Sequence, residues 1–407
     1  MFIHTVSQGE SLHDISKLYS VAASLIIDHN GLTMPDRLCE GQKLMIFTPT
    51  RTHSVKGGDT LDKISHRFGV SPESLLRNNP SLISERKSRP GEILSIKYDT
   101  PRFGLGLANG YLYSGCTRER LLEVLPYLSY LTVSALKLEG GKIIHLFDPG
   151  SALKLAREAN KAAILRIYSS DAKISDGGDE LCKRIAELAV RSGYSGVSLA
   201  AYRAAHEDKD FGEFLLALRK KLLREDLLLF TELDGNSDEI GFSEADAVSD
   251  GVSLNYEKCS MQNIPSFECG ERRLLSEYAE KYECAKAFVE IPCFAYDGSR
   301  PISVSDAVGF ARKHNKKISY DPERKICHYE YTRFSHGERE AARVAFESAE
   351  NVKAKLELIG ELGFMGIAFD IMRIPREYLM LFHTSFRCPE AQGVESSRLD
   401  CRGNPQK

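Results

Sequence analysis

The chain has 407 residues, a formal net charge of −3 and a hydrophobic content of 42%. This length exceeds that of one small domain and is enough to bury a large core. The near balance of charge gives no global basic field, so nucleic acid is not indicated as a partner. No stretch approaches the ~20 apolar residues that a membrane helix needs. The first residues show no basic and apolar leader, so we expect synthesis in the cytoplasm without a signal peptide.

Ten cysteines are scattered along the chain, and none of them forms a Cys-x-x-Cys pair. No pair of histidines at ligand spacing accompanies them, so we expect no structural metal site. A Gly-rich phosphate loop is also missing from the sequence, and we expect no cofactor. The pattern is typical of free thiols in a protein made in a reducing compartment. Cys388 and Cys401 lie near the end of the chain, and a disulfide cross-link between chains through them stays an open possibility.

An internal repeat fills the first quarter of the chain. Residues 4–12 (His-Thr-Val-Ser-Gln-Gly-Glu-Ser-Leu) recur as residues 53–61 (His-Ser-Val-Lys-Gly-Gly-Asp-Thr-Leu). Ser11 and Thr60 precede apolar residues at helical spacing, as helix N-caps do. Each unit then closes with a Gly turn and an apolar strand. We therefore predict two βααβ units, residues 1–49 and 50–98.

The two units resemble LysM modules, and the resemblance implies binding to N-acetylglucosamine polymers, that is, peptidoglycan or chitin. In that family the groove lies between the first strand–helix loop and the loop after the second helix. Backbone amides and small polar groups there suit N-acetyl sugars. The positions that the resemblance assigns to glycan binding are Gly9, Glu10, Ser11, Leu12, Asn30, Gly31, Gly58, Asp59, Thr60, Leu61, Asn79 and Pro80.

The two units differ in charge. Residues 51–98 contain nine Lys or Arg against five Asp or Glu, whereas residues 1–50 contain three against five. A cationic surface attracts an anionic wall polymer. The charges therefore predict that the second unit contributes more to wall attraction.

From Leu105 onward, strand-like and helix-like segments alternate, which favours a parallel α/β architecture. The predicted strands are Leu105–Leu112, Tyr130–Ala135, Ala163–Ile167, Gly196–Ala200, Leu227–Glu232, Gly251–Leu254, Ala287–Pro292 and Gly366–Phe369. Amphipathic helices are predicted between them at Leu181–Arg191, Phe211–Leu223, Glu271–Tyr282 and Ser348–Leu362. Eight such strands predict a (β/α)8 TIM barrel over residues 102–388. The polar end, residues 389–407, is expected to be a disordered tail.

The fourth predicted strand of the barrel resembles that of family-18 glycoside hydrolases. The family pattern there is Asp-Gly-x-Asp-x-Asp-x-Glu, and the last Glu protonates the leaving group. In this chain the four carboxylate positions are Ser195, Ser198, Ala200 and Tyr202. The setting is that of a hydrolase, but its reacting groups are replaced.

Weaker resemblance to the same family extends from about Phe103 to Phe386. Residues 109–111 resemble the end of the first strand, residues 254–257 the sixth, residues 291–297 the seventh and residues 363–370 the eighth. Asp370 stands where the family has a Trp, and the chain has no Trp at all. Residues at about 302–334 resemble the small α+β insertion of the spore-cortex branch, with a helix at 304–314 and short strands at 317–321 and 326–331. The resemblance places six residues in the barrel pocket: Tyr111, Tyr202, Tyr256, Glu257, Tyr296 and Asp370.

Family-18 hydrolysis uses the acetamide of the sugar as nucleophile, with an Asp to orient it and a Glu as acid. Ala200 cannot orient an acetamide. Tyr202, with an ordinary pKa near 10, is a poor proton donor to a glycosidic oxygen. We therefore expect no catalytic residue at the family positions, and a pseudo-glycosidase that binds glycan in the spore envelope or cell wall, in contact with other envelope proteins and without membrane insertion.

Two other functions stay open. An active glycosidase would need relocated carboxylates, and the candidates at the predicted mouth are Glu232, Asp234, Glu257 and Asp370. These acids have a plainer interpretation as partners of Arg166, Arg203 or Arg373 in salt bridges. In the other alternative, the barrel binds another protein and the LysM units only localise it.

Overall fold

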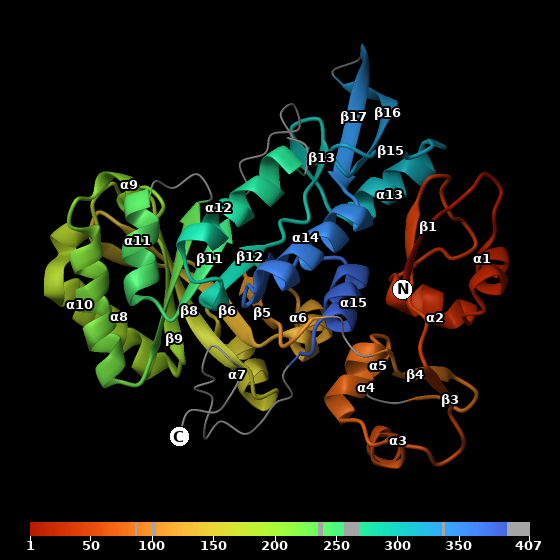
Figure 1. The fold of residues 1–407 in the computed structure, drawn as a ribbon, viewed down its shortest axis with the longest axis horizontal. Coiled ribbons are helices and arrows are strands. Elements are labelled where there is room, and N and C mark those ends of the chain that lie inside the picture. The colour runs from red at the N-terminus through yellow and green to blue at the C-terminus, as the bar shows by residue number, and fades with distance from the viewer. Residues whose placement is uncertain (86–87, 100–102, 235–238, 256–267, 336–337, 389–407) are drawn as a thin grey trace.

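The computed structural model describes residues 1–85, 88–99, 103–234, 239–255, 268–335 and 338–388. Its parts are two small N-terminal modules, a large barrel and a smaller sheet inserted late in the barrel (Figure 1). The modules lie on one side of the barrel, next to its last helices, and the inserted sheet rises above them. The fold is therefore mixed α/β with a TIM barrel at its centre, as the sequence predicted.

The first module has the predicted order of strand, helix, helix and strand. These elements are β1 (Phe2–Thr5), α1 (Leu12–Tyr19), α2 (Ala23–His29) and β2 (Lys43–Ile46). Helix α1 begins with a capping box: the Ser11 hydroxyl accepts from the Asp14 amide, and the Asp14 carboxylate accepts from the Ser11 amide. This exchange satisfies two of the amides that a helix start leaves free, which explains why a short helix begins here.

The second module repeats this order and adds one short helix. Its elements are β3 (Arg51–Ser54), α3 (Leu61–Phe68), α4 (Pro72–Asn78), α5 (Leu82–Glu85) and β4 (Ile93–Lys97). Thr60 caps α3, and Ser71 caps α4 with Pro72 in its first turn, where a missing amide costs nothing. Strand β3 pairs with β4 as β1 pairs with β2. The predicted repeat is confirmed.

Eight parallel strands close the barrel, each within a few residues of its predicted position. They are β5 (Leu107–Leu112), β6 (Tyr130–Glu139), β8 (Ala162–Ser169), β9 (Gly196–Ala200), β10 (Leu228–Asp234), β11 (Gly251–Asn255), β12 (Ala287–Glu290) and β18 (Gly366–Asp370). Strand β5 pairs with both β18 and β6, which closes the ring. An antiparallel strand that was not predicted, β7 (Lys142–His145), extends β6 beyond the barrel.

Helices and short turns surround the strands (Figure 1). The longer helices are α6 (Arg118–Val124), α7 (Gly150–Glu158), α8 (Gly178–Ser192), α10 (Phe211–Arg224), α11 (Glu239–Val248), α12 (Arg273–Lys281), α14 (Ala349–Leu362) and α15 (Arg376–Ser385). The shorter turns are η1 (Leu125–Tyr127), η2 (Ser175–Gly177), α9 (Ala204–Glu207), η3 (Glu268–Arg272) and η4 (Cys284–Lys286). None of the helices in the described ranges combines the length and the apolar character needed to cross a membrane.

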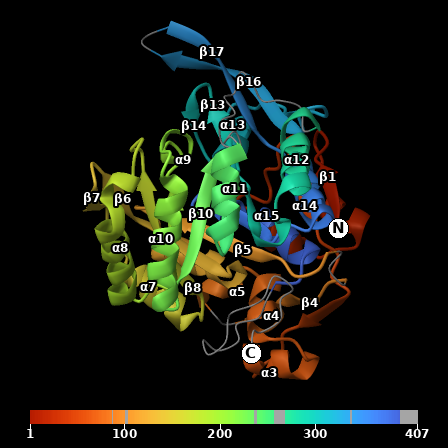
Figure 2. The same ribbon diagram turned by 60° about the vertical axis from the view of Figure 1, so that its left-hand side comes forward.

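The insertion between β12 and β18 is larger than predicted. It contains β13 (Ala295–Asp297), β14 (Arg300–Pro301), α13 (Val304–Lys313), β15 (Ser319–Asp321), β16 (Ile326–Ser335) and β17 (Glu338–Glu347). Helix α13 and strand β15 agree with the prediction. Strand β16 is longer than predicted, and its partner β17 was not predicted at all. The two form a long hairpin that projects from the molecule (Figure 2).

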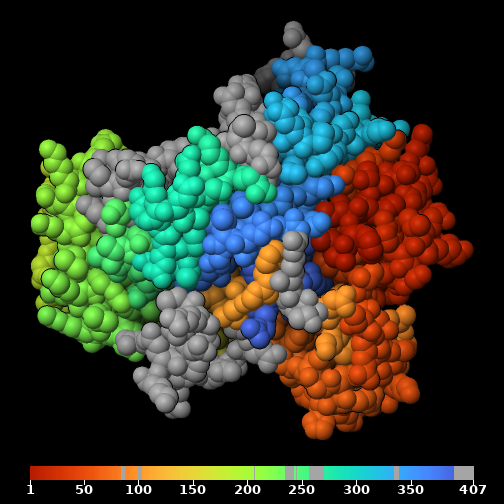
Figure 3. Space-filling model, in the orientation of Figure 1, coloured from red at the N-terminus to blue at the C-terminus, as the bar shows by residue number. Residues whose placement is uncertain are grey.

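The first module docks on the inserted sheet as well as on the barrel, and the space-filling view shows them in contact (Figure 3). The Glu40 carbonyl accepts a hydrogen bond from the Ile318 amide at 2.9 Å. A Cβ on Gly41 would lie 1.9 Å from the Ile318 carbonyl oxygen, and Gly41 has a φ of +82°. Only glycine fits both the conformation and the close approach, so this turn fixes the module on the insertion.

The second module shares its hydrophobic core with the barrel. Its residues Leu75, Leu82 and Ile83 belong to the same buried cluster as the barrel residues Leu125 and Leu128. Most of the first module's core forms a separate cluster around Ile15. The two modules are therefore similar in fold and different in how they are embedded.

Cys388 lies in the shared core and is 7% exposed. Burial raises the pKa of its thiol to about 11. A buried, protonated thiol is a poor partner for exchange, so the structure argues against the cross-link considered for Cys388. Cys401 and the predicted tail, residues 389–407, lie outside the described residues.

Candidate functional site

The mouth of the barrel holds a buried ion pair. Arg166, on β8, and Glu232, on β10, meet across β9. The Arg166 Nε atom lies 2.8 and 2.9 Å from the two Glu232 oxygens, and its Nη2 atom lies 2.7 Å from Oε2. Arg166 is 7% exposed and Glu232 is 3% exposed. This bidentate pair spans the strand on which family-18 hydrolases carry their acids.

Three hydroxyl groups complete the pair. Ser198 donates to Glu232 Oε1 at 2.8 Å, and Tyr202 donates to Oε2 at 3.0 Å. On the other side, the Arg166 Nη1 atom donates to the Ser134 hydroxyl at 3.1 Å. Each oxygen of Glu232 therefore accepts from several donors, and the desolvation of both charges is compensated locally. Two of the four family acid positions, Ser198 and Tyr202, thus donate hydrogen bonds to the Glu232 carboxylate.

Tyrosine rings surround the guanidinium. The Arg166 Cζ atom lies 5.5 Å from the ring centre of Tyr111, 5.7 Å from that of Tyr113 and 5.9 Å from that of Tyr168. Such distances allow cation–π attraction. The guanidinium at the mouth is thus flanked by three aromatic rings.

The electrostatics of this cluster oppose proton donation. Burial, and then the charge of Glu232, raise the pKa of Tyr202 above its ordinary value. Burial opposes the charge of Arg166, but Glu232 outweighs it, and the pKa of the guanidinium lies well above its ordinary value. Tyr202 is thus a weaker acid than free tyrosine and a poor proton donor.

The other family positions contribute no reacting group. Ser195 is exposed and lies before the first residue of β9, at the end of the strand opposite the mouth. Ala200 is fully buried, with an apolar side chain. Of the predicted pocket residues, Tyr111 is buried in the barrel. Tyr296 lies on β13 of the inserted sheet and stacks on Phe294.

The predicted alternative acids have separate outcomes. Asp370 accepts from the Met372 amide, and its Oδ2 atom lies 3.4 Å from Arg373 Nε, the salt-bridge partner named from the sequence. Arg203, the third such candidate, pairs with Glu207 instead. Tyr256 and Glu257, and the side chain of Asp234, lie outside what the structure describes.

One carboxylate at the mouth escaped the sequence reasoning. Glu290 is the last residue of β12, and its charge contributes to raising the pKa values of Tyr111, Tyr113 and Tyr202. Its place immediately before Ile291 and Pro292, at the carboxyl end of a predicted strand, was the available signal. Across the described ranges, no three His, Cys, Asp or Glu side chains gather as a metal site.

In the LysM modules, two residues predicted to contact glycan make hydrogen bonds within their own module. The Asn30 amide nitrogen donates to the carbonyls of Ile26 and Met45, and its oxygen accepts from the Met45 amide. Asn79 makes the equivalent bonds to Leu75 and Ser95. Both residues are buried, and their side chains hold the returning strand.

The acidic residue of each first loop also closes its own turn. Glu10 accepts from the Ser7 amide and pairs with His4, and Asp59 accepts from the Lys56 amide and pairs with His53. The groups left at the rim of the loops are the exposed Gly9, Ser11, Gly58 and Thr60.

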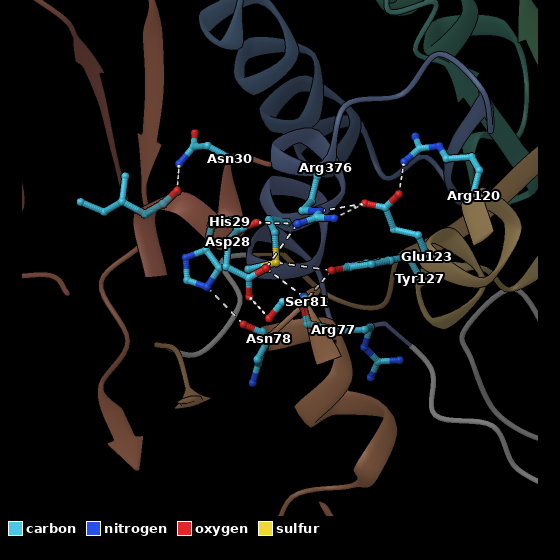
Figure 4. A network of polar contacts seen from close by, with 12 residues as sticks. Asp28, His29, Asn30, Arg77, Asn78, Ser81, Arg120, Glu123, Tyr127 and Arg376 are labelled. Carbon is cyan, nitrogen blue, oxygen red and sulfur yellow. Dashed lines mark hydrogen bonds and ion pairs between the residues drawn. The ribbon is translucent and has the colours of Figure 1, made fainter. Parts of the chain in front are cut away.

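A polar network joins the two modules to the barrel (Figure 4). Arg376, on α15, lies between Asp28 of the first module and Glu123 of α6, and bonds both. Asp28 also accepts from the amide and hydroxyl of Ser81 in the second module. The Tyr127 hydroxyl donates to the Arg77 carbonyl. The modules are therefore held on the barrel by directed contacts over a sequence separation of up to 348 residues.

Comparison with known proteins agrees with the fold. The LysM domain family matches residues 4–47 and 53–97. A protein named as a sporulation-specific glycosylase, YdhD of Bacillus subtilis, is 23% identical over an alignment 407 residues long. The alignment covers 90% of this chain and 94% of the relative.

Among solved structures, the spore cortex-lytic enzyme SleL of Bacillus megaterium has a TM-score of 0.73 at 20% identity and covers 95% of this chain and 98% of its own. A chitinase of Chromobacterium violaceum has a TM-score of 0.60 at 16% identity, over 69% of this chain and 98% of its own. The chain thus carries two LysM domains, followed by a barrel with the fold of these enzymes.

Proposed function

We propose that this protein is a non-catalytic glycan-binding protein. It would combine two LysM domains with a barrel that has the fold of spore cortex-lytic enzymes. Its ligand would be an N-acetylglucosamine polymer of the peptidoglycan or chitin type. The names of its relatives point to sporulation and the spore cortex, so we place it in the spore envelope or cell wall.

The observation that carries the pseudo-enzyme proposal is the Arg166–Glu232 pair. A glycosidase needs a carboxylic acid that can give up a proton. At this mouth Glu232 is ionically paired with an arginine and accepts from Ser198 and Tyr202. Removing it from that pair to make an acid would leave a guanidinium buried without its counter-charge, which costs several kcal/mol.

Hydrolysis and binding are tested separately. The full chain should sediment with insoluble peptidoglycan or chitin, and it should release no sugar from cortex muropeptides or from a chromogenic N-acetylglucosaminide. Loss of a general acid alone lowers a rate by about 10²–10⁴. Turnover within tenfold of SleL assayed alongside would contradict the proposal, and Glu232→Gln and Glu290→Gln would then locate the acid.

A rescue experiment examines the pocket itself. The double change Ala200→Asp with Tyr202→Glu restores the last two acids of the family pattern. Tyr202 now touches Glu232 at 3.0 Å, so the new Glu would meet a like charge, which raises the pKa of one of the two carboxyl groups. We expect a folded, destabilised protein with at most trace hydrolysis. Robust hydrolysis would show that the pocket still accepts substrate and that its loss of activity is superficial.

A further inference from the structure

We propose that the first LysM module makes the glycan contact and that the second serves as the anchor that holds it on the barrel. This division rests on the proposed function and names which of two similar modules performs it. It reverses the expectation from net charge, which favoured the second module.

The second wall of the groove differs between the modules. In the second module this wall is the segment 79–83, and every residue in it except the exposed Ser81 is buried. Leu82 and Ile83 belong to the core shared with the barrel, where α5 packs against α6. The apolar groups of this wall face the barrel, so they are not available to a sugar.

In the first module the equivalent segment is 30–34, in which Asn30 is buried and Leu32 is half-buried, but the other three residues face solvent. Gly31, Thr33 and Met34 are exposed, and Met34 has an exposed fraction of 53%. Arg376 supports the base of this wall, because its side chain lies 3.8 Å from where a Cβ on Gly31 would stand. A large exposed apolar side chain beside small polar groups is a surface suited to the mixed faces of an N-acetyl sugar.

The other wall of each groove is the loop between the first strand and the first helix, and it does not favour the second module either. Both loops are open, since nothing lies within 4 Å of a Cβ built on Gly9 or Gly58. In the second module, however, the Gly58 carbonyl already accepts from Lys63 at 2.8 Å. Lys63 corresponds to Asp14, which bonds Ser11 at the start of α1 instead. One backbone acceptor of the second groove is thus engaged by the module itself.

Several cations of the second module are likewise engaged. Arg77 is 2% exposed and donates to the Pro126 carbonyl. Arg67 pairs with Asp59 at 3.2 Å. These side chains enter the net charge, yet Arg77 is buried and Arg67, whose side chain is 49% exposed, is paired within the module. Net charge therefore overstates what the second module offers.

The test uses the full chain and insoluble chitin, whose uncharged chain removes general attraction to cations. The matched variants are Gln8→Glu and Gly57→Glu, which occupy equivalent exposed positions in the two first loops. Gly57 has open space at its Cβ and no positive φ, so the change is tolerated. A third variant, Thr33→Glu with Met34→Glu, alters the exposed wall of the first module. Native circular dichroism is required of each.

We expect the Thr33/Met34 variant to weaken chitin retention about tenfold, the loss of roughly 1.4 kcal/mol of contact. Gln8→Glu should weaken it a few-fold, and Gly57→Glu should leave it within twofold of the wild type. An equal effect of Gln8→Glu and Gly57→Glu would overturn the division, as would unchanged retention of the Thr33/Met34 variant. If the wild-type chain itself fails to bind chitin and peptidoglycan, the proposed function fails instead, so the two results are distinguishable.

Discussion

The barrel mouth and the first LysM groove use the same kinds of side chain in opposite ways. At the mouth, the Glu232 carboxylate accepts hydrogen bonds from Arg166, Ser198 and Tyr202, so these polar groups bond one another. In the first module, Asn30 and Glu10 satisfy backbone groups beneath the groove. This arrangement leaves backbone and small side chains exposed at the rim.

The difference bears on the proposal that the first module binds glycan and that the barrel does not hydrolyse it. A binding surface needs polar groups beneath it that are satisfied and a rim that is not. In a buried charge pair, the donors and acceptors of the two side chains bond each other and are not offered to a ligand. Because one fold can carry different functions, the fold of a hydrolase does not by itself imply hydrolysis.

The largest expected effect comes from breaking the mouth. Arg166→Met leaves the buried Glu232 carboxylate without its counter-charge, and removing one partner of such a pair costs about 3–5 kcal/mol. Unfolding by urea, followed by circular dichroism, measures this loss of free energy.

The matched control for that change is the double variant Arg166→Met with Glu232→Met. Replacing both partners by apolar groups is often neutral, so most of the lost stability should return. A cost below 1 kcal/mol in the single variant would mean that Glu232 reaches another cation or water. The mouth would then be less closed than the geometry indicates.

Most of the fold could be predicted from the sequence, because its signals are local. Alternating apolar strands and amphipathic helices identified all eight barrel strands, and the internal repeat identified the two modules. Strand β17 was missed for a physical reason. Its sequence, Glu-Arg-Glu-Ala-Ala-Arg-Val-Ala-Phe-Glu, is rich in helix-forming residues. Ten paired residues along β16 override that preference.

The site could be predicted only in part. The sequence named Glu232 as a candidate acid and Arg166 as a candidate partner, but pairing them required the register of three neighbouring strands. The junction between the LysM modules and the barrel, formed around Asp28 and Arg376, could not be predicted, because these two residues come together only in the tertiary structure. The different burial of the two modules depends likewise on tertiary packing, in which Leu82 and Ile83 join the barrel core, and equal sequence patterns gave no sign of it.

A second prediction concerns the pH dependence of the junction. Burial raises the pKa of Asp28 from 3.8 to about 6, against the opposing charge of Arg376. Since the folded pKa lies above the unfolded one, the contribution to stability is full below pH 3.8 and is lost as pH rises through about 6. Its span is at most roughly 3 kcal/mol. The measurement is the unfolding free energy of the wild type minus that of Asp28→Asn, from pH 7 to pH 4, and this difference should grow as pH falls.

Asp59 supplies a control of opposite sign in the second module. Its bond with His53, followed by that with the Lys56 amide, lowers the pKa of Asp59 to about 2. The difference between wild type and Asp59→Asn should therefore shrink as pH falls below about 4. A flat difference for Asp28→Asn over the range would show that Arg376 keeps the carboxylate ionised, and that the junction resists acid by its ion pairs alone.

The smallest expected effect distinguishes the two modules at their helix caps. Ser11 exchanges two hydrogen bonds with Asp14, whereas Thr60 accepts one, from the Lys63 amide at 3.3 Å. Loss of an N-cap side chain costs about 1 kcal/mol, so Ser11→Ala should destabilise by about that amount and Thr60→Ala by somewhat less. Ser11→Gly, which tolerates the cap conformation, should cost only a few tenths of a kcal/mol.

Because the core around Ile15 is separate from the barrel core, we expect the loss in Ser11→Ala to appear as local opening of the first module. Faster amide exchange in α1, with unchanged exchange in β9, would report it. Equal acceleration in both elements would mean that the first module unfolds only together with the barrel, and is not the independently exposed unit that its rim suggests.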